Sequence, residues 1–214
     1  MRLLLITDWL LGRARLLSAL EAACALGPQV AVQHRHPEAA TRPFLAEARE
    51  LAALCARHGN LLFVNGRLDV ALLVGAHVHL PADGPTPSQV RPHLPPGRWL
   101  SAAVHDEAEL RRSAGADLVL LSPVFRPTSK PADARPPLGP AEFARLRGLA
   151  KSSALALGGI HPDTLPLLAP VEGVAVQGAV LRHPQPASVA RALLGLLSRP
   201  GAPPEPLASG VPAL

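Results

Sequence analysis

Several residue types are scarce in this sequence, and each shortage excludes a class of protein. The chain has no tyrosine, two tryptophans and four phenylalanines among its 214 residues. It therefore offers few rings on which the bases of a single-stranded nucleic acid could stack. Its two cysteines, Cys24 and Cys55, lack CxxC spacing and fall in segments with a helical pattern. Neither a disulfide framework nor a zinc site is expected, and we expect the chain to work in the reducing cytoplasm.

Lysine and long apolar runs are also scarce. Only Lys130 and Lys151 among the 21 basic residues are lysines, and the arginines form no basic run, although the formal charge is +5. That distribution argues against a nucleic-acid partner and favours anionic small ligands. The first apolar run ends at Thr7 and Asp8, and no long uncharged apolar segment follows. Neither a signal peptide nor a contact with the membrane is expected.

The sequence has instead a repeated alternation of short aliphatic runs and longer amphipathic segments, which is typical of βα units around a parallel sheet. The predicted strands are Leu3–Thr7, Val30–Gln33, Leu61–Val64, Val78–Leu80, Leu100–Ala103, Leu118–Leu121, Ala154–Leu157 and Val174–Val176. The predicted helices are Arg13–Leu26, Arg42–Arg57, Arg67–Val74, Ser88–His93, Asp106–Ala114, Pro140–Ala150, Pro162–Leu168 and Ala187–Leu197. This pattern predicts an α/β fold, a single-domain TIM (β/α)8 barrel, over residues 1–197. The proline-rich residues 198–214 are predicted to form a disordered tail.

Glycines mark the ends of several predicted helices, where a turn into the next strand favours a residue that tolerates positive φ. They are Gly27, Gly59, Gly75, Gly115 and Gly173. The proline-rich segment Ser122–Gly139 is too long for an ordinary connection, so it is a candidate active-site loop.

Polar residues and glycines follow most of the predicted strands. The C-terminal ends of the strands carry the catalytic face of a TIM barrel, so these residues should converge on one mouth. They are Thr7, Asp8, Gln33, Arg35, Asn65, His79, His105, Ser122, Gly158, Gly159, Gln177 and Gly178. After strands seven and eight, the N–H groups of Gly158, Gly159 and Gly178, with a short helix over Ala179–Leu181, form a candidate phosphate site. His34 and His36 would form a metal pair only if a carboxylate joined them, and the sequence indicates none.

Eight motifs follow one another between Arg2 and about Leu197: RLLLITD, AVQHR, LLFVNGRLDVALLVGAHVHL, AAVH, GADLVLLSPVF, SK, LALGGI and GVAVQGAV. Their order resembles that of the thiamine phosphate synthase and thiazole tautomerase (TenI-like) superfamily. The resemblance implies a TIM barrel that binds a thiazole phosphate. It implies that the phosphate is held by the two glycine-bearing loops and a Ser/Thr-Lys pair, which correspond here to Gly159, Gly178, Ser129 and Lys130.

In this superfamily the synthase couples a hydroxymethylpyrimidine pyrophosphate to the thiazole phosphate and requires Mg²⁺. The resemblance indicates four departures at the metal and pyrophosphate positions: Gly66 for an aspartate, Pro37 for a lysine, Ala103 for a serine, and Asp83 displaced by one position. Gln33 and Arg35 of the pyrophosphate motif are retained. The departures favour the tautomerase branch, which moves a proton and needs no metal.

The expected function is therefore a metal-independent thiazole tautomerase without a cofactor, in which His105 acts as acid and base because an imidazole titrates near neutral pH. The expected substrate-binding residues are Thr7, Gln33, Arg35, Asn65, His79, Ser129 and Lys130, and the expected phosphate-binding residues are Gly158, Gly159, Gln177 and Gly178.

Two other functions remain open. One is a Mg²⁺-dependent thiamine phosphate synthase with an altered pyrophosphate site, in which Asp83 would hold the metal. The other is a barrel that binds a phosphate ligand without chemistry, for which the departures at Gln177 and Arg126 argue. In each case the expected partner is a small-molecule phosphate, and a homo-oligomer is possible.

Overall fold

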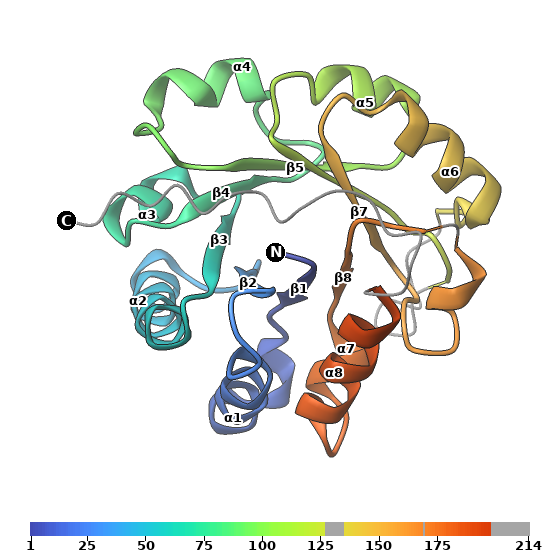
Figure 1. The fold of residues 1–214 in the computed structure, drawn as a ribbon. Coiled ribbons are helices and arrows are strands. Elements are labelled where there is room, and N and C mark those ends of the chain that lie inside the picture. Colours follow the sequence, from blue (N-terminus) through green and yellow to red (C-terminus); the bar gives the residue numbers. More distant parts are fainter. Residues whose placement is uncertain (127–134, 169, 198–214) are drawn as a thin grey trace.

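The computed structural model describes residues 1–126, 135–168 and 170–197, which form a closed barrel of parallel strands (Figure 1). The strands are β1 (Leu3–Ile6), β2 (Val30–His34), β3 (Leu61–Asn65), β4 (His77–Leu80), β5 (Leu100–Val104), β6 (Leu118–Leu121), β7 (Ser153–Leu157) and β8 (Val174–Val176). Each strand pairs with the next in the chain, and β8 returns to β1 through Leu3 opposite Val174 and Leu5 opposite Val176. The predicted TIM barrel is confirmed.

Helices surround the sheet, and Figure 1 places α8 beside α1, where the two ends of the barrel meet. The helices are α1 (Arg13–Cys24), α2 (Thr41–His58), α3 (Leu68–Leu73), α4 (Pro87–Val90), α5 (Glu107–Arg112), α6 (Gly139–Leu149), α7 (Gly178–Leu181) and α8 (Pro186–Leu197). Short 3-10 turns are η1 (Trp9–Leu11), η2 (Arg91–His93) and η3 (Leu165–Leu167). No helix in the described ranges is long and apolar enough to cross a membrane.

The strands are buried on both faces, which explains why they appear in the sequence as continuous aliphatic runs rather than as alternating patterns. Leu4, Phe63, Leu120 and Leu155 belong to one cluster, which fills the barrel interior. Their neighbours along the strands, such as Leu5, pack in a second cluster against the helices. With both faces occupied, only the ends of the strands are left to form a site.

One predicted helix is wrong. The segment Pro162–Leu168 contains only the 3-10 turn η3. Pro166 has no N–H to continue an α-helix, and the Thr164 hydroxyl accepts from the His161 N–H and donates to the Gly159 carbonyl. These local bonds hold the segment in a turn.

The expected role of Gly173 is also wrong. Gly27, Gly59, Gly75 and Gly115 have positive φ as predicted, but Gly173 does not. A Cβ on Gly173 would lie 2.4 Å from the Arg2 carbonyl oxygen. Glycine is needed there because the backbones of the first and last strands approach closely.

Candidate active site

A cavity of about 1040 Å³ opens at the C-terminal ends of the strands. Most of the residues predicted for the barrel mouth line it: Gln33, Arg35, Asn65, His79, His105, Ser122, Gly158, Gly159, Gln177 and Gly178. Asp83, the residue named for the synthase alternative, lines it too. Sequence reasoning therefore located the mouth correctly, because parallel strands bring their C-terminal ends together.

Positive charge predominates in the described lining of this cavity. Its arginines are Arg35, Arg112, Arg126, Arg135 and Arg182, and its carboxylates are Asp83 and Glu109. Guanidinium groups bind carboxylates and phosphates through planar pairs of hydrogen bonds. The lining is therefore suited to a ligand with several negative charges.

The β2 side of the cavity offers polar groups that no described residue satisfies. Gln33 is 2% exposed, and its Oε1 is buried without a hydrogen-bond partner. The Arg35 side chain has no hydrogen bond or ion pair within the described ranges. A buried polar atom without a partner is costly, so this side is suited to a ligand that supplies the missing bonds.

Thr7 does not line the cavity, contrary to its predicted role in substrate binding. It is 1% exposed, and its hydroxyl accepts from the Arg35 N–H at 2.9 Å and donates to the Arg35 carbonyl at 3.0 Å. Both bonds go to the backbone, so Thr7 fixes the segment that carries Arg35 and has no free group for a ligand.

His79 is fixed inside the barrel mouth. Its Nδ1 lies 2.9 Å from the Ser101 hydroxyl. Burial, and secondarily the charge of Arg35, lower the pKa of His79 to about 3, so its imidazole is neutral at physiological pH. A neutral imidazole in this position can shape the cavity and exchange hydrogen bonds, but it supplies no charge.

His105 lies at the end of β5 with a carboxylate beside it. Its Nδ1 is 3.3 Å from Glu109 Oε2, and its backbone N–H donates to the same oxygen at 2.8 Å. Asp106 caps α5 by accepting from the Glu109 N–H. Burial first, then the charges of Asp106 and Asp83, raise the pKa of Glu109. The imidazole thus lines the cavity with a carboxylate beside it. Its Nδ1 makes no hydrogen bond within the described residues.

The loop after β7 requires glycine at two successive positions. Gly158 and Gly159 have φ of +99° and +65°. A Cβ on Gly158 would lie 2.8 Å from Pro123 Cα, and one on Gly159 would lie 2.6 Å from Phe125 Cβ. The N–H groups of Gly159 and of Gly178 have no acceptor among the described residues. They are therefore available to an anion in the cavity.

The segment after β8 is joined to the end of β1. Gln177 donates from Nε2 to the Thr7 carbonyl at 3.2 Å. Arg182 donates from Nε to Asp8 Oδ2 at 2.9 Å, and its Nη2 lies 2.7 Å from the same oxygen. The predicted short helix is present as α7, with Gly178 as its first residue. Gln177 and Arg182 both line the cavity, so these links tie its β8 side to the end of β1.

Some candidate site residues lie outside the described residues, and others were not predicted from the sequence. Ser129 and Lys130 fall outside the described residues. Sequence reasoning did not single out Glu109, Arg112 or Arg182. Glu109 had a signal, because it stands at the third helical position after Asp106, where a carboxylate commonly bonds back to the helix start. Arg182 had none, since nothing in the sequence pairs it with Asp8.

A second polar cluster lies beside the site. Glu47 of α2 contacts both histidines that flank Arg35: His36 Nδ1 at 3.0 Å and His34 Nε2 at 3.5 Å. The sequence indicated no such carboxylate. His34 Nε2 is also 3.2 Å from the Phe44 carbonyl. A carbonyl oxygen only accepts, so Nε2 must carry the proton and has no lone pair left to bind a metal. Within the described ranges, no group of three or more His, Cys, Asp or Glu could hold a metal ion.

The magnesium that a synthase would require can still be compared with the residues present. Mg²⁺ is usually held by one or two carboxylates together with substrate phosphates and water. Asp83 lines the cavity, has no hydrogen-bond or ion-pair partner within the described ranges, and lies close enough to raise the pKa of Glu109. Gly66 supplies no ligand. The donor set fits a magnesium ion shared between Asp83 and the phosphates of a ligand.

The fold and the cavity define a TIM-barrel protein with an arginine-rich mouth. The chain belongs to the thiamine monophosphate synthase family, whose model matches residues 3–180. A thiamine-phosphate synthase of Albidiferax ferrireducens is 35% identical over 202 residues, covering 92% of each chain. One of Parasynechococcus marenigrum is 37% identical over 192 residues, covering 87% of this chain and 53% of that longer protein.

A solved structure agrees with the sequence comparisons. The thiamine phosphate pyrophosphorylase from Pyrococcus furiosus has a TM-score of 0.79 and 27% identity, covering 92% of this chain and 95% of that one. Membership in this family of thiamine-biosynthesis barrels is thereby established for the chain.

Proposed function

We propose that this protein is a thiamine-phosphate synthase, which joins a hydroxymethylpyrimidine pyrophosphate to a thiazole phosphate. From the sequence alone the expected function was the tautomerase and the synthase was an alternative to it. The relatives named above favour the synthase. The observation that carries it is one cavity with two unsatisfied anion-binding regions. One is Gln33 with Arg35, and the other is the N–H groups of Gly159 and Gly178.

The two regions correspond to the two phosphorylated substrates of such a reaction. The bond between the pyrimidine methylene carbon and the pyrophosphate oxygen breaks, and a bond from that carbon to the thiazole nitrogen forms. Arg35 and Gln33 would hold the pyrophosphate by charge-assisted hydrogen bonds. Asp83 would hold magnesium, which when bound offsets the charge of the departing pyrophosphate. The cavity of about 1040 Å³ is large enough for two small substrates together.

The test is to incubate the purified protein with both substrates and Mg²⁺ and to measure thiamine phosphate by mass spectrometry. We expect product that disappears with EDTA. Asp83→Asn should lower kcat/KM at least about tenfold, because one carboxylate ligand becomes a neutral amide. The absence of product from the wild-type protein would refute the synthase.

The tautomerase remains a second candidate because His105 lies within 3.3 Å of Glu109 in the same cavity. Such an enzyme would move a proton on a thiazole carboxylate phosphate with EDTA present. His105→Ala should then lower the rate by roughly 10²–10⁴-fold with little change in substrate affinity, whereas the exposed His93 can be changed to Ala as a control without effect.

A further inference from the structure

Arg35 lines the cavity, yet its guanidinium makes no hydrogen bond or ion pair with any described residue. Its direction therefore depends on the backbone that carries it. On one side that backbone is held by Thr7, which follows β1 and bonds to both the N–H and the carbonyl of Arg35. Preorganising a binding group reduces the cost of ordering it when the ligand arrives. Whatever holds the other side of this segment thus affects any anion bound by Arg35.

The residues around Arg35 alternate between the cavity and helix α2. Gln33 and Arg35 line the cavity. His34 and His36 instead contact Glu47 of α2. Successive side chains of an extended chain point to opposite sides, so the two histidines fix the direction in which their neighbours point. A rotation of the segment about its own axis would turn Arg35 out of the cavity and would pull both histidines away from α2.

Glu47 is the group at which the two histidines meet. His36 Nδ1 lies 3.0 Å from each oxygen of its carboxylate, and His34 Nε2 lies 3.5 Å from Oε2. The Glu47 side chain is 16% exposed, so little water competes for these contacts. One carboxylate thus ties both outward-facing residues of the segment to α2.

Ring contacts restrict the same two histidines. The His36 ring stacks on Trp9, with centroids 5.4 Å apart and planes 9° apart. The His34 ring stacks on Phe44 of α2, with centroids 4.0 Å apart. Neither imidazole can turn freely, so the contacts with Glu47 hold the backbone as well as the rings.

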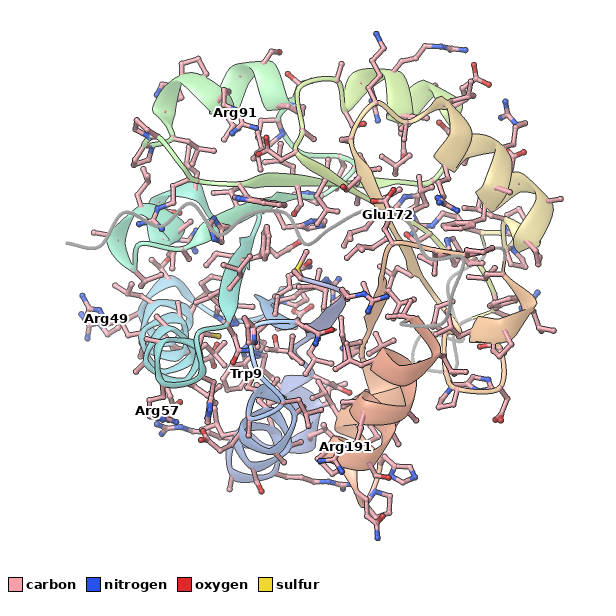
Figure 2. All side chains as sticks on the ribbon, viewed as in Figure 1. Trp9, Arg49, Arg57, Arg91, Glu172 and Arg191 are labelled. Carbon is pink, nitrogen blue, oxygen red and sulfur yellow. The ribbon has the colours of Figure 1, made fainter. Side chains whose placement is uncertain are left out.

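Glu47 differs from the charged residues on the outer side of α2. Arg49 and Arg57 are exposed and point away from the barrel (Figure 2). Glu50 pairs with Arg13 of α1 at 2.8 Å. Glu50 therefore carries the same charge on the same helix and contacts α1 instead of the Arg35 segment.

We propose that Glu47 is a positioning residue for the anion site of Arg35, which it keeps directed into the cavity by holding His34 and His36 against α2. The identity of the anion, the pyrophosphate group of the pyrimidine substrate, rests on the proposed function. The positioning rests on the contacts described above. Its effect has the opposite sign to that of charge alone. A carboxylate repels a nearby anion, so its removal would strengthen anion binding by charge, whereas the loss of positioning weakens it.

The test measures binding of inorganic pyrophosphate to the full-length protein by calorimetry in the presence of Mg²⁺. The variants are Glu47→Ala, Glu47→Gln and His36→Phe, and Glu50→Ala is the matched control. Glutamine keeps the length of the side chain and one acceptor oxygen. Phenylalanine keeps a ring to stack on Trp9 but cannot bond to Glu47. The KM values of both proposed substrates are measured on the same proteins.

We expect Glu47→Ala and His36→Phe to weaken pyrophosphate binding about 3- to 30-fold, the usual range of coupling within one hydrogen-bond network. Glu47→Gln should stay within about twofold of the wild type, as should Glu50→Ala. The KM of the pyrimidine pyrophosphate should rise by the same factor as the dissociation constant, while the KM of the thiazole phosphate stays within about twofold. A general loss of stability would affect both substrates alike.

A second measurement shows whether Glu47 acts through Arg35. Lysine carries its charge on a flexible stem, so it depends less on the direction of its backbone than a planar guanidinium does. In the Arg35→Lys background the loss caused by Glu47→Ala should therefore fall below about twofold. An equal loss in both backgrounds would overturn the inference.

Two other results would also overturn it: a wild-type protein that binds no inorganic pyrophosphate, or a Glu47→Ala variant that binds pyrophosphate as tightly as the wild type or more tightly. If pyrophosphate binding depends on Glu47 and Arg35 as expected but no thiamine phosphate is formed, the inference stands and the proposed function fails. If thiamine phosphate is formed and Glu47→Ala loses no affinity, the proposed function stands and the inference fails.

Discussion

Gly159 is the residue at which the cavity wall tolerates a side chain least. Its φ of +65° disfavours every residue with a Cβ, and the space beside it is taken by Phe125. The position therefore combines a backbone requirement with a packing requirement. Both arise because the loop after β7 lies directly under the chain that leaves β6, as the bond from the Phe125 N–H to the Gly158 carbonyl indicates.

We predict that Gly159→Ala lowers the free energy of unfolding by about 2–5 kcal/mol, the sum of a left-handed backbone cost and overpacking. It should also abolish stabilisation by phosphate. Urea unfolding measures the first and thermal shift the second. Gly148→Ala is the control, because Gly148 lies inside α6 with nothing within 4 Å of a new Cβ. This variant should be more stable than the wild type by about 0.5–1 kcal/mol. Equal effects of the two variants would contradict this account.

Single residues also mark where the sequence was informative and where it was not. His105 and Gly159 each stand two residues beyond a predicted aliphatic strand, so their place in the cavity could be predicted from the strand pattern alone. Thr7 stands in the same kind of position, yet its hydroxyl bonds to the Arg35 backbone. Which way a side chain turns at a strand end depends on its neighbour in space, and that neighbour is 28 residues away.

Among the elements, α5 is short, and its first turn is hydrogen-bonded to the end of β5, where His105 lies. Asp106 accepts from the Glu109 N–H at 2.8 Å, and Glu109 in turn accepts from the His105 N–H. The two bonds connect the end of β5 to the first turn of α5. The orientation of His105 therefore depends on whether this helix start is formed.

We predict that Asp106→Ala lowers the free energy of unfolding by about 1 kcal/mol, as expected for the loss of an N-cap, and also lowers the turnover of whichever reaction the cavity catalyses. Asp106→Asn should retain both properties, because asparagine caps helices about as well as aspartate. Urea unfolding and initial rates of the wild type, Asp106→Ala and Asp106→Asn measure the stability and the turnover. Equal turnover in the alanine variant would separate the helix start from the site.

The strands and helices were predicted to within a few residues wherever burial leaves a pattern. Strands buried on both faces are aliphatic throughout, and long helices such as α2 carry an amphipathic pattern. The turns η1 and η3 were not predicted, because each rests on local hydrogen bonds rather than on hydrophobic periodicity, and η3 also contains Pro166. Contacts such as Glu47 with His34 and His36 join separate elements and leave no local signal.

For the molecule as a whole, buried neutral histidines make stability depend on pH. Burial lowers the pKa of His34 and of His77 to about 4, and that of His79 to about 3. Their unfolded pKa is about 6.5, so below that pH the unfolded chain binds more protons than the folded one. Stability from these histidines is fully present above about pH 6.5 and is lost as the pH falls toward 4.

We predict that the free energy of unfolding falls between about pH 6.5 and 4, by about 1.4 kcal/mol per pH unit for each histidine. Urea unfolding at several pH values measures this slope. His77→Asn should reduce the slope by one histidine, since its amide oxygen can still accept from the Trp99 N–H that now bonds to His77 Nδ1. His77 lies at the start of β4, away from the cavity. An unchanged slope in this variant would contradict the assignment.

The meeting of β8 with β1 has a consequence for how the chain reaches this structure. β8 spans only Val174–Val176, and it pairs with the first strand of the chain. Until those three residues are in place, the growing sheet has two open edges, and both are aliphatic. Such edges attract other chains, and contacts between the two ends of a sequence form slowly. The hazard of aggregation therefore lasts until nearly the whole barrel has been synthesised, and it ends with the last strand.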